Sequence, residues 1–338
     1  MKILFIGGTG VISTACVTEA LDVGHDVWVL NRGLSRLPNR VGPERTLIAD
    51  ASDESQAREA LGSRRFDVVI QWTAFVPRQI ELDLRLYADA GQYVFISSAS
   101  AYEKPPSSWL ITERTPLRNP YWQYSRDKIG CEEVLREAHQ SMGFPMTIIR
   151  PSHTYGFSKI PVAIGSSAMP FTIIDRMRRG ATILVPGDGT SIWTLTHNTD
   201  FAKGLIPLLG RSEAIGEDFQ ITSDEALTWN QIYSLVARAS GVELHALHVP
   251  SDAFVAADPT QLGDLWGDKA NSAVFDNSKL RSVVPDFKAV VPFEQGIQEA
   301  VEWFDADPDR QEIDDAANAQ WDRLAVIYGD ALARAATS

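Results

Sequence analysis

The sequence predicts an α/β fold, with a doubly wound parallel sheet followed by a smaller lobe of mixed α/β structure. Three observations indicate this. Short apolar runs alternate with helical segments through the first half of the chain. A glycine-rich turn follows the first apolar run. After Arg150-Pro151 proline and glycine become frequent, and the predicted elements become short and mixed.

Six runs are predicted to be strands, and they are apolar throughout, as is typical of parallel strands covered on both faces by helices. They are residues 3–6, 26–30, 46–49, 68–71, 93–96 and 146–149. The predicted helices are a first one ending at Leu21, then residues 54–61, 80–90, 120–141, 200–209 and 229–240.

The composition is that of an ordinary globular protein, since 44% of the 338 residues are hydrophobic and 22% are charged. The formal net charge of −13 argues against nucleic acid or an anionic membrane as partner, because both attract basic surfaces. No run reaches the ~20 apolar residues of a membrane span, and no signal-peptide pattern is present, so we expect a cytoplasmic protein. Cys16 and Cys131 form no CxxC motif; we expect both to be buried and no metal site.

The segment Gly7–Ser13 follows the first strand and opens the first helix, which is the context of a dinucleotide-binding turn. Gly7 allows the tight turn, and Gly10 lets a pyrophosphate approach the backbone. The helix N-terminus offers free N–H groups to the phosphates. The third glycine position holds Ser13, which is small enough for close packing but weakens the match.

The second strand ends at Asn31-Arg32. An acidic residue at Asn31 would bind the 2′-hydroxyl of NAD, whereas Arg32 can face a 2′-phosphate, so NAD(P) is expected with a lean towards NADP. Asp50 follows the third strand and is either an adenine ligand or a solvated loop residue.

These features divide the chain into three parts. We expect an NAD(P)-binding domain of the Rossmann type, carrying the catalytic residues, over residues 1–156. A substrate lobe is expected mainly over 157–310, with a segment at about 190–225 returning to the first domain. A helical tail is expected over 311–338.

Tyr124 and Lys128 stand four apart on a predicted helix and therefore share a face. A nearby ammonium favours phenolate and lowers the tyrosine pKa towards neutrality, which suits acid–base chemistry. Alone, the spacing also fits an ordinary exposed helical contact. The hydroxyls of Ser97–Tyr102 follow the fifth strand, where the carboxyl ends of the strands open onto the ligand crevice.

With these residues in place, the chain resembles the extended short-chain dehydrogenase/reductase family, in its NAD-dependent epimerase/dehydratase group. The resemblance runs from Gly7 to about Phe304. It is carried by Gly7–Ser13, Asp50, Ser97–Tyr102, Glu113 with Pro116, Tyr124–Lys128, Arg150 through Gly156, Gly187–Gly189 and Asp200.

The resemblance implies a role for each matching position. Tyr124 would be the general acid/base, and Lys128 would lower its pKa and hold the nicotinamide ribose. Ser98 would hydrogen-bond the reacting oxygen. The implied cofactor contacts are Gly7, Gly10, Val11, Ile12, Asn31, Arg32, Asp50, Lys128 and Pro151.

Three departures from the family pattern concern the substrate. Ala99-Ser100 follow Ser98 where dehydratases carry an Asp-Glu pair, so dehydration is disfavoured. His153 replaces an asparagine usual in sugar-nucleotide enzymes, and is either a substrate ligand or a satisfied interior residue. Trp193 replaces an arginine that grips a nucleotide diphosphate; it can stack on a sugar or pack in the lobe core.

The expected substrate is therefore sugar-like or polyol-like, and not necessarily a nucleotide sugar. Ser100, Tyr121, His153 and Trp193 are its candidate contacts. Trp72, Phe75 and Trp122 also fall near the predicted crevice; each alone fits core or lid packing, and together with Trp193 they indicate an aromatic-lined pocket. The lost arginine charge could be replaced by Lys159, Arg176, Arg178 or Lys269.

The leading interpretation is an NAD(P)-dependent oxidoreductase or epimerase that transfers hydride at a secondary alcohol or ketone. The sequence does not separate an epimerase from a dehydrogenase or reductase. The alternative is a non-catalytic cofactor-binding regulator or RNA-binding protein of the same fold. Family habit predicts a homodimer formed through helices around 80–90 and 124–140.

Overall fold

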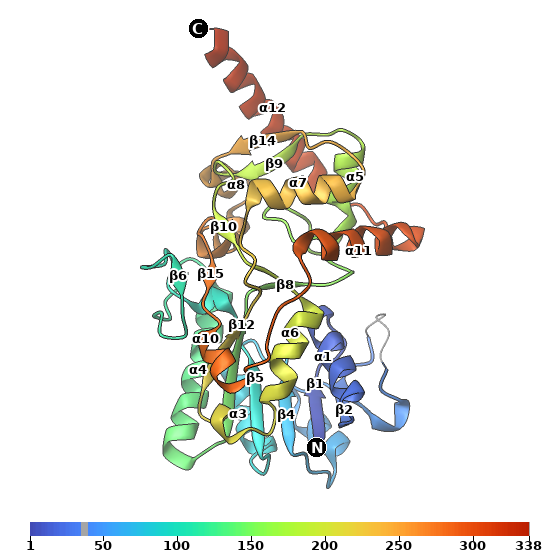
Figure 1. Ribbon diagram of the computed structural model, residues 1–338, viewed down its shortest axis with the longest axis vertical. Coiled ribbons are helices and arrows are strands. Elements are labelled where there is room, and N and C mark those ends of the chain that lie inside the picture. Colours follow the sequence, from blue (N-terminus) through green and yellow to red (C-terminus); the bar gives the residue numbers. More distant parts are fainter. Residues whose placement is uncertain (35–39, 338) are drawn as a thin grey trace.

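The computed structural model describes residues 1–34 and 40–337. Its centre is a seven-stranded parallel sheet of order β12-β7-β5-β4-β1-β2-β3 (Figure 1). The strands are β1 (Lys2–Ile6), β2 (Asp26–Asn31), β3 (Thr46–Ile48), β4 (Val68–Gln71), β5 (Gln92–Ile96), β7 (Met146–Pro151) and β12 (Asp218–Ile221). The predicted doubly wound parallel sheet is confirmed, and β12 is a seventh strand that was not predicted.

Successive residues of the strands bury their side chains on opposite faces of the sheet. Ile3 and Phe5 belong to one apolar layer, whereas Leu4 and Ile6 belong to the other. Helices cover both layers, as Figure 1 shows. They are α1 (Val11–Asp22), α6 (Asn198–Leu205) and α10 (Ser278–Val283) on the first layer, and α2 (Glu54–Leu61), α3 (Pro77–Leu86) and α4 (Gln123–Met142) on the second.

The two cysteines are buried in these layers, as predicted, with Cys16 on α1 and Cys131 on α4. The third helix begins and ends earlier than predicted, because Pro77 occupies its first turn, where proline is favoured. The side chain of Gln79 accepts a hydrogen bond from the backbone N–H of Val76 at 3.1 Å and fixes this start.

The strand order reverses between β1 and β4, and parallel sheets bind their ligands at such a switch point, beyond the carboxyl ends of the strands. The strand ends near it are Ile6, Gln71 and Ile96. The site residues therefore have to be sought on the segments that follow β1, β4 and β5.

The remaining elements form most of the lobe, with an apolar core of its own. Its strands are β6 (Leu110–Ile111), β8 (His153–Tyr155), β9 (Ile183–Pro186), β10 (Ile192–Trp193), β11 (Leu195–His197), β13 (Leu227–Thr228), β14 (Ala246–Val249) and β15 (Val274–Phe275). Its helices are α5 (Phe171–Arg178), α7 (Trp229–Ala239), α8 (Ser251–Ala257), α9 (Leu262–Asp264), α11 (Phe293–Asp305) and α12 (Asp315–Thr337). The pair β9–β14 is parallel and β10–β13 is antiparallel, so the lobe is mixed.

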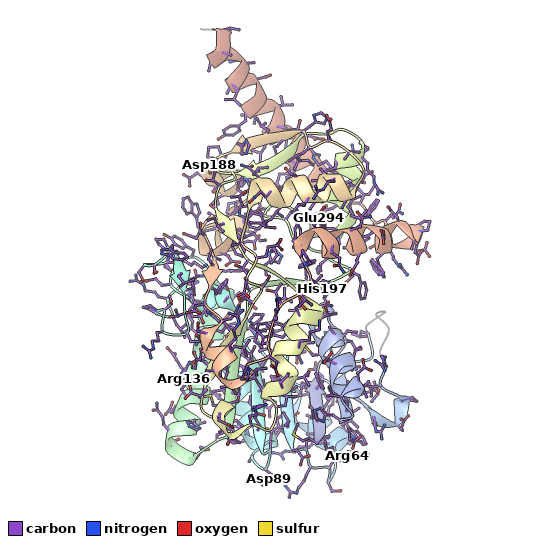
Figure 2. All side chains as sticks on the ribbon, in the orientation of Figure 1. Arg64, Asp89, Arg136, Asp188, His197 and Glu294 are labelled. Atoms are coloured by element: carbon purple, nitrogen blue, oxygen red, sulfur yellow. The ribbon has the colours of Figure 1, made fainter. Side chains whose placement is uncertain are left out.

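The segment at about 190–225 passes from the lobe to the sheet. It contains α6, which packs on α1, and β12, which pairs with β7. His197, labelled in Figure 2, lies where the lobe meets the sheet domain and caps α6. The last helix, α12, extends from the lobe away from the sheet (Figure 1). Within the described residues no helix is both long and apolar enough to cross a bilayer.

Candidate active site

The turn after β1 is shaped by two glycines in the left-handed region. Gly7 has φ 110° and Gly8 has φ 77°. A Cβ on Gly8 would lie 2.9 Å from a methyl group of Val29, so no larger residue fits without a shift. The hydroxyl of Ser13 accepts a hydrogen bond from the N–H of Gly10 at 2.9 Å. The serine at the third glycine position therefore caps α1 and is tolerated there.

Three cavities follow one another along this turn. The first, of about 540 Å³, and the second, of about 490 Å³, share Gly7, Thr9, Gly10 and Thr73. The third, of about 340 Å³, shares Ile12, His153, Thr154 and Lys269 with the second. Three cavities in a row along the turn suit an elongated ligand with a polar centre, such as a dinucleotide. The indole N–H of Trp72, beside the turn, is buried and has no hydrogen-bond partner among the described residues.

Most of the predicted cofactor residues line these cavities. Asn31, Arg32 and Asp50 line the first cavity, together with Gly7 and Gly10. The amide oxygen of Asn31 accepts from the N–H of Gly33 at 2.8 Å, which leaves its NH₂ group for a ligand. Val11 and Ile12 line the second cavity, and Pro151 lines the third.

Asp50 is fixed in its loop by its own turn. Its carboxylate accepts hydrogen bonds from the N–H and the hydroxyl of Ser52, at 2.9 and 2.7 Å. These bonds lower the pKa of Asp50, so the side chain is an anionic acceptor next to Arg32.

Ser98 and Tyr124 both line the third cavity. Ser98 caps a short 3₁₀ turn, Ala99–Ala101, and its hydroxyl lies 2.9 Å from that of Ser100. The hydroxyl of Ser125 in turn donates to Ser100 at 2.8 Å. This chain of hydroxyls fixes the orientation of Ser98.

Burial raises the pKa of Tyr124, while a hydrogen bond with Ser98 opposes the rise. The positive charge of Lys128 was expected from the sequence to lower the pKa of Tyr124, and that predicted direction of the shift is wrong. The expected lowering rested on charge alone, whereas removal of the phenolate from water is the larger effect in this cavity wall.

Lys128 is buried and is not among the residues that line the three cavities. Its ammonium donates to the carbonyl oxygens of Ala74, at 2.8 Å, and Ile96, at 2.9 Å. It lies 5.8 Å from the ring centre of Tyr124. Burial lowers the pKa of Lys128 to about 8, so the side chain is mainly cationic at neutral pH. Two of its three N–H donors are occupied, which leaves one for a ligand.

The four predicted substrate residues do not all come together. Ser100, His153 and Trp193 line the third cavity, whereas Tyr121 is not among its lining residues and packs against Trp266 at 6.4 Å between ring centres. Tyr121 lies three residues before Tyr124, in the segment that precedes α4. The side chain turns away because the segment before α4 is held by Asn119, whose amide oxygen accepts from the N–H of Tyr121.

Trp193 belongs both to the cavity wall and to the lobe core. It is 2% exposed and packs on Trp229, with ring centres 5.2 Å apart. Its indole N–H donates to the carbonyl of Lys269 at 3.2 Å. Trp193 can therefore offer a ligand its ring but not its N–H.

His153 lies between the second and third cavities, with its ring 6.2 Å from that of Trp193. Burial and the neighbouring Lys269 and Lys159 lower the pKa of His153 to about 3. The imidazole is therefore neutral at physiological pH, with one donor and one acceptor nitrogen.

The other predicted aromatic residues are divided among the cavities. Trp122 lines the third cavity with its ring 5.0 Å from that of Tyr124. Trp72 lines the second and Phe75 the first. The aromatic side chains therefore line all three cavities and do not gather in a single substrate pocket.

Four charged residues line the third cavity, and three of them, Lys104, Asp264 and Asp268, were not singled out from the sequence; the fourth, Lys269, was named as a possible replacement for the lost arginine charge. Lys104 pairs with Asp268 at 3.5 Å, and Lys269 pairs with Asp264 at 2.5 Å. Lys104 and Asp268 are far apart in the chain and have no common motif, so only the fold brings them together. Arg176 and Arg178 lie elsewhere, paired with Asp322 and Asp305.

Metal ligands are not grouped in this way. Over residues 1–34 and 40–337, no cluster of three or more His, Cys, Asp or Glu side chains is placed to hold a metal ion.

Residues 3–222 match the NAD dependent epimerase/dehydratase family. The 2'-dehydrokanamycin reductase of Streptomyces kanamyceticus is 24% identical, over 85% of this chain and 80% of that protein. The chloroplast stem-loop binding protein of 41 kDa b of Arabidopsis thaliana is 27% identical, over 71% of this chain and 63% of that protein. A UDP-glucose 4-epimerase of Lactobacillus helveticus is 29% identical, over 56% of this chain and 62% of that protein.

Solved structures share the fold at low sequence identity. The UDP-glucose 4-epimerase of Thermotoga maritima, solved with UDP-glucose, superposes with a TM-score of 0.71 at 18% identity, over 90% of this chain and 99% of that one. The family match spans well over half of the chain and includes the turn, Ser98 and the Tyr124–Lys128 pair. The protein is therefore a member of the NAD-dependent epimerase/dehydratase family.

Proposed function

We propose that this protein is an NAD(P)-dependent oxidoreductase or epimerase that transfers hydride at a secondary alcohol or ketone of a sugar-like substrate. The observation that carries the proposal is the meeting of Ser98 and Tyr124 in one cavity wall, with the ammonium of Lys128 5.8 Å from the Tyr124 ring centre and the cavity of the Gly7–Ser13 turn next to it. The reductase and epimerases among its relatives support it.

When bound, the nicotinamide supplies the hydride acceptor or donor. The protein handles the proton. In the reduction direction the phenol of Tyr124 donates its proton to the carbonyl oxygen and becomes a phenolate; in the oxidation direction the phenolate accepts the proton of the substrate hydroxyl. Ser98 donates a hydrogen bond to the reacting oxygen. Lys128 keeps a positive charge below Tyr124, where it stabilises the phenolate as it forms.

Substitution of Tyr124 tests the proposal. We expect Tyr124→Phe to lower kcat by about 10²–10⁴-fold, because it removes the proton-transfer group and little volume. The matched control is Tyr121→Phe, which lies outside the cavity and should keep wild-type activity. The measurement is the change in reduced-nicotinamide absorbance with a panel of keto sugars and polyols, alongside cofactor affinity.

The non-catalytic alternative predicts the opposite result. If Tyr124→Phe keeps full biological activity while cofactor binding persists, the protein is a cofactor-gated regulator. One relative is named as a stem-loop binding protein, but the net charge of −13 opposes RNA binding.

We infer further that the substrate lacks a nucleoside diphosphate. Both ammonium groups of the third cavity, on Lys104 and Lys269, already face carboxylates. Trp193 stands at the position of the family's phosphate-binding arginine and offers only a ring. Micromolar binding of UDP or GDP sugars in calorimetry, weakened by removal of the diphosphate, would refute this inference.

Two further pairs of residues support a reaction type and a cofactor preference. Ala99-Ser100 carry no acid and base for water elimination, which supports epimerase or reductase chemistry over dehydration; formation of a dehydrated keto product would contradict this. Arg32 lines the first cavity and Asn31 brings no negative charge, which supports NADP. A lower Kd for NAD⁺ than for NADP⁺ would contradict that preference.

We also propose a homodimer formed through α3 and α4. The two helices pack closely enough that a Cβ on Gly130 would lie 2.9 Å from the ring of Pro77, so they form one rigid surface. A monomer in light scattering at micromolar concentration would overturn this.

A further inference from the structure

The second cavity has an unusual balance of charge for so acidic a protein. Among the described residues that line it are Lys159, Lys269 and His153 but no aspartate or glutamate, although the chain has 44 acidic and 31 basic residues. The same cavity is bordered by Gly7–Ser13, the turn whose backbone suits phosphate groups. A cavity lined in this way selects an anion.

Lys159 is the lysine of this cavity whose charge is not balanced. Lys269 pairs with Asp264. Within the described part of the chain no carboxylate pairs with Lys159; its ammonium donates to the backbone carbonyl of Ser167 at 2.9 Å. The side chain is half-buried, and burial lowers the pKa of Lys159. An ammonium held partly out of water without a counter-charge is costly, and a bound anion offsets that cost.

The loop that carries Lys159 is held in place at both ends. The backbone N–H of Lys159 donates to the carbonyl of Gly156 at 3.0 Å. The hydroxyl of Ser166 donates to Asp314 at 2.8 Å, which ties the far end of the loop to the segment before α12. Lys159, from the segment after β8, and the glycine turn therefore line the same cavity.

We propose that Lys159 is a cofactor-binding residue that pairs with the pyrophosphate of the dinucleotide from the lobe side. The glycine turn binds that group through backbone N–H donors, and Lys159 supplies the positive charge that the turn lacks. The lobe thereby contributes to cofactor retention as well as to substrate binding. This inference rests on the proposed function for the identity of the cofactor.

The test compares Lys159→Met, which keeps the length of the side chain and removes its charge, with Lys159→Arg and with Lys288→Met, an exposed lysine outside the three cavities. Calorimetry on protein freed of co-purified nucleotide would measure NADP⁺, NAD⁺, ADP and adenosine. We expect Lys159→Met to weaken NADP⁺, NAD⁺ and ADP about tenfold, with a shallower dependence on salt, and to leave adenosine unchanged. Lys159→Arg and Lys288→Met should stay near wild type.

Two outcomes would overturn the inference. Unchanged affinity of Lys159→Met for ADP and both dinucleotides, with only a raised KM for a phosphorylated substrate, would assign the lysine to the substrate. An equal loss for adenosine would show a structural effect. Both leave the proposed function standing, because that fails only if the wild-type protein binds no dinucleotide or if Tyr124→Phe stays active.

Discussion

The ends of two neighbouring strands hold Lys128, and they do so with different electrostatics. Its ammonium donates to the carbonyl of Ala74, beyond β4, and to that of Ile96, the last residue of β5. Each strand end is also linked by a hydrogen bond to a buried carboxylate: Asp83 bonds to Gln71 of β4, and Glu132 bonds to Ser97, the residue after β5. One carboxylate has cationic partners and the other has none among the described residues, so the two supports of one lysine should respond differently to substitution and to pH.

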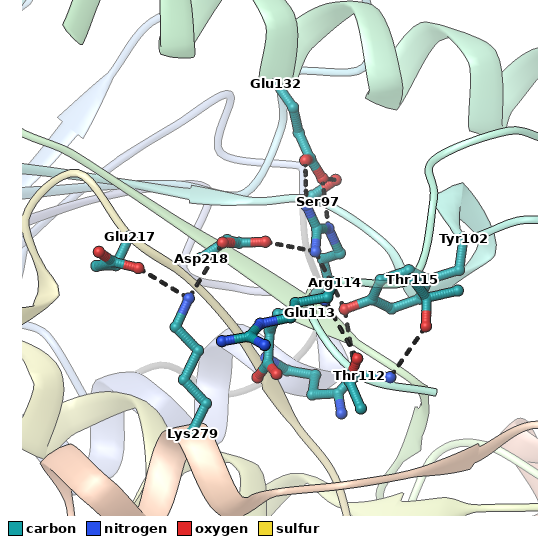
Figure 3. Close-up of polar contacts among 12 residues, drawn as sticks. Ser97, Tyr102, Thr112, Glu113, Arg114, Thr115, Glu132, Glu217, Asp218 and Lys279 are labelled. Carbon is teal, nitrogen blue, oxygen red and sulfur yellow. Dashed lines mark hydrogen bonds and ion pairs between the residues drawn. The ribbon is translucent and has the colours of Figure 1, made fainter. Parts of the chain in front are cut away.

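At the end of β5 the carboxylate of Glu132 is part of a charged network (Figure 3). It accepts from the hydroxyl of Ser97 at 2.6 Å and receives two hydrogen bonds from the guanidinium of Arg150, at 2.9 and 2.6 Å. Arg150 also pairs with Asp218 of β12 at 2.6 Å. Attraction to Arg150 compensates the burial of the Glu132 charge.

At the end of β4 the carboxylate of Asp83 has only neutral donors. It accepts from the amide of Gln71 and the hydroxyl of Tyr93, both at 2.6 Å. The amide oxygen of Gln71 then accepts from the N–H groups of Thr73 and Ala74, which fixes the turn that presents the Ala74 carbonyl. Burial raises the pKa of Asp83 to about 7, because neutral hydrogen bonds do not balance the desolvation of the charge.

The largest effect is expected at Glu132. Glu132→Gln leaves the buried Arg150 with Asp218 as its one close counter-charge in the described part of the chain, and loss of one partner of a buried pair costs about 3–5 kcal/mol of unfolding free energy. Urea unfolding at pH 7 measures this. Glu133→Gln, one residue along and exposed, should change stability by less than ~0.5 kcal/mol. Similar values for the two variants would show that the Glu132 charge is not balanced by Arg150 as the geometry indicates.

A pH dependence should distinguish Asp83. Its pKa is about 7 in the folded protein and near its usual 3.8 when unfolded, so between these values the folded state binds the extra proton. Its contribution therefore decreases as pH rises through this window and is constant above it. From about pH 5 to about pH 7 we expect wild type to lose ~2–3 kcal/mol relative to Asp83→Asn.

The measurement is urea unfolding of both proteins across that range, with Asp89→Asn, an exposed aspartate paired with Arg65, as control. A constant difference between wild type and Asp83→Asn would mean that Asp83 is ionised throughout. That result would contradict the raised pKa of Asp83.

The sequence predicted the elements that follow a simple pattern and missed those stabilised by distant partners. Apolar periodicity located six strands, but β12 carries Asp218 and Gln220, whose polar side chains are buried against Arg150 and Tyr102. A strand with charged and amide residues does not look buried until its partners are known. The spacing of Tyr124 and Lys128 marked the site, while the direction of the Tyr124 pKa depended on burial that no spacing reveals.

The smallest effect is expected at two adjacent serines, one of which should affect stability and the other catalysis. Ser97 donates to Glu132 behind the strand, whereas Ser98 lines the cavity. Ser97→Ala removes one hydrogen bond to a charged group, so we expect a loss of about 1.5 kcal/mol in unfolding free energy with kcat within about twofold. Ser98→Ala should do the reverse and lower kcat at least tenfold with stability within ~0.5 kcal/mol. If Ser97→Ala loses activity without losing stability, Ser97 acts in catalysis, and its hydrogen bond to Glu132 does not stabilise the fold.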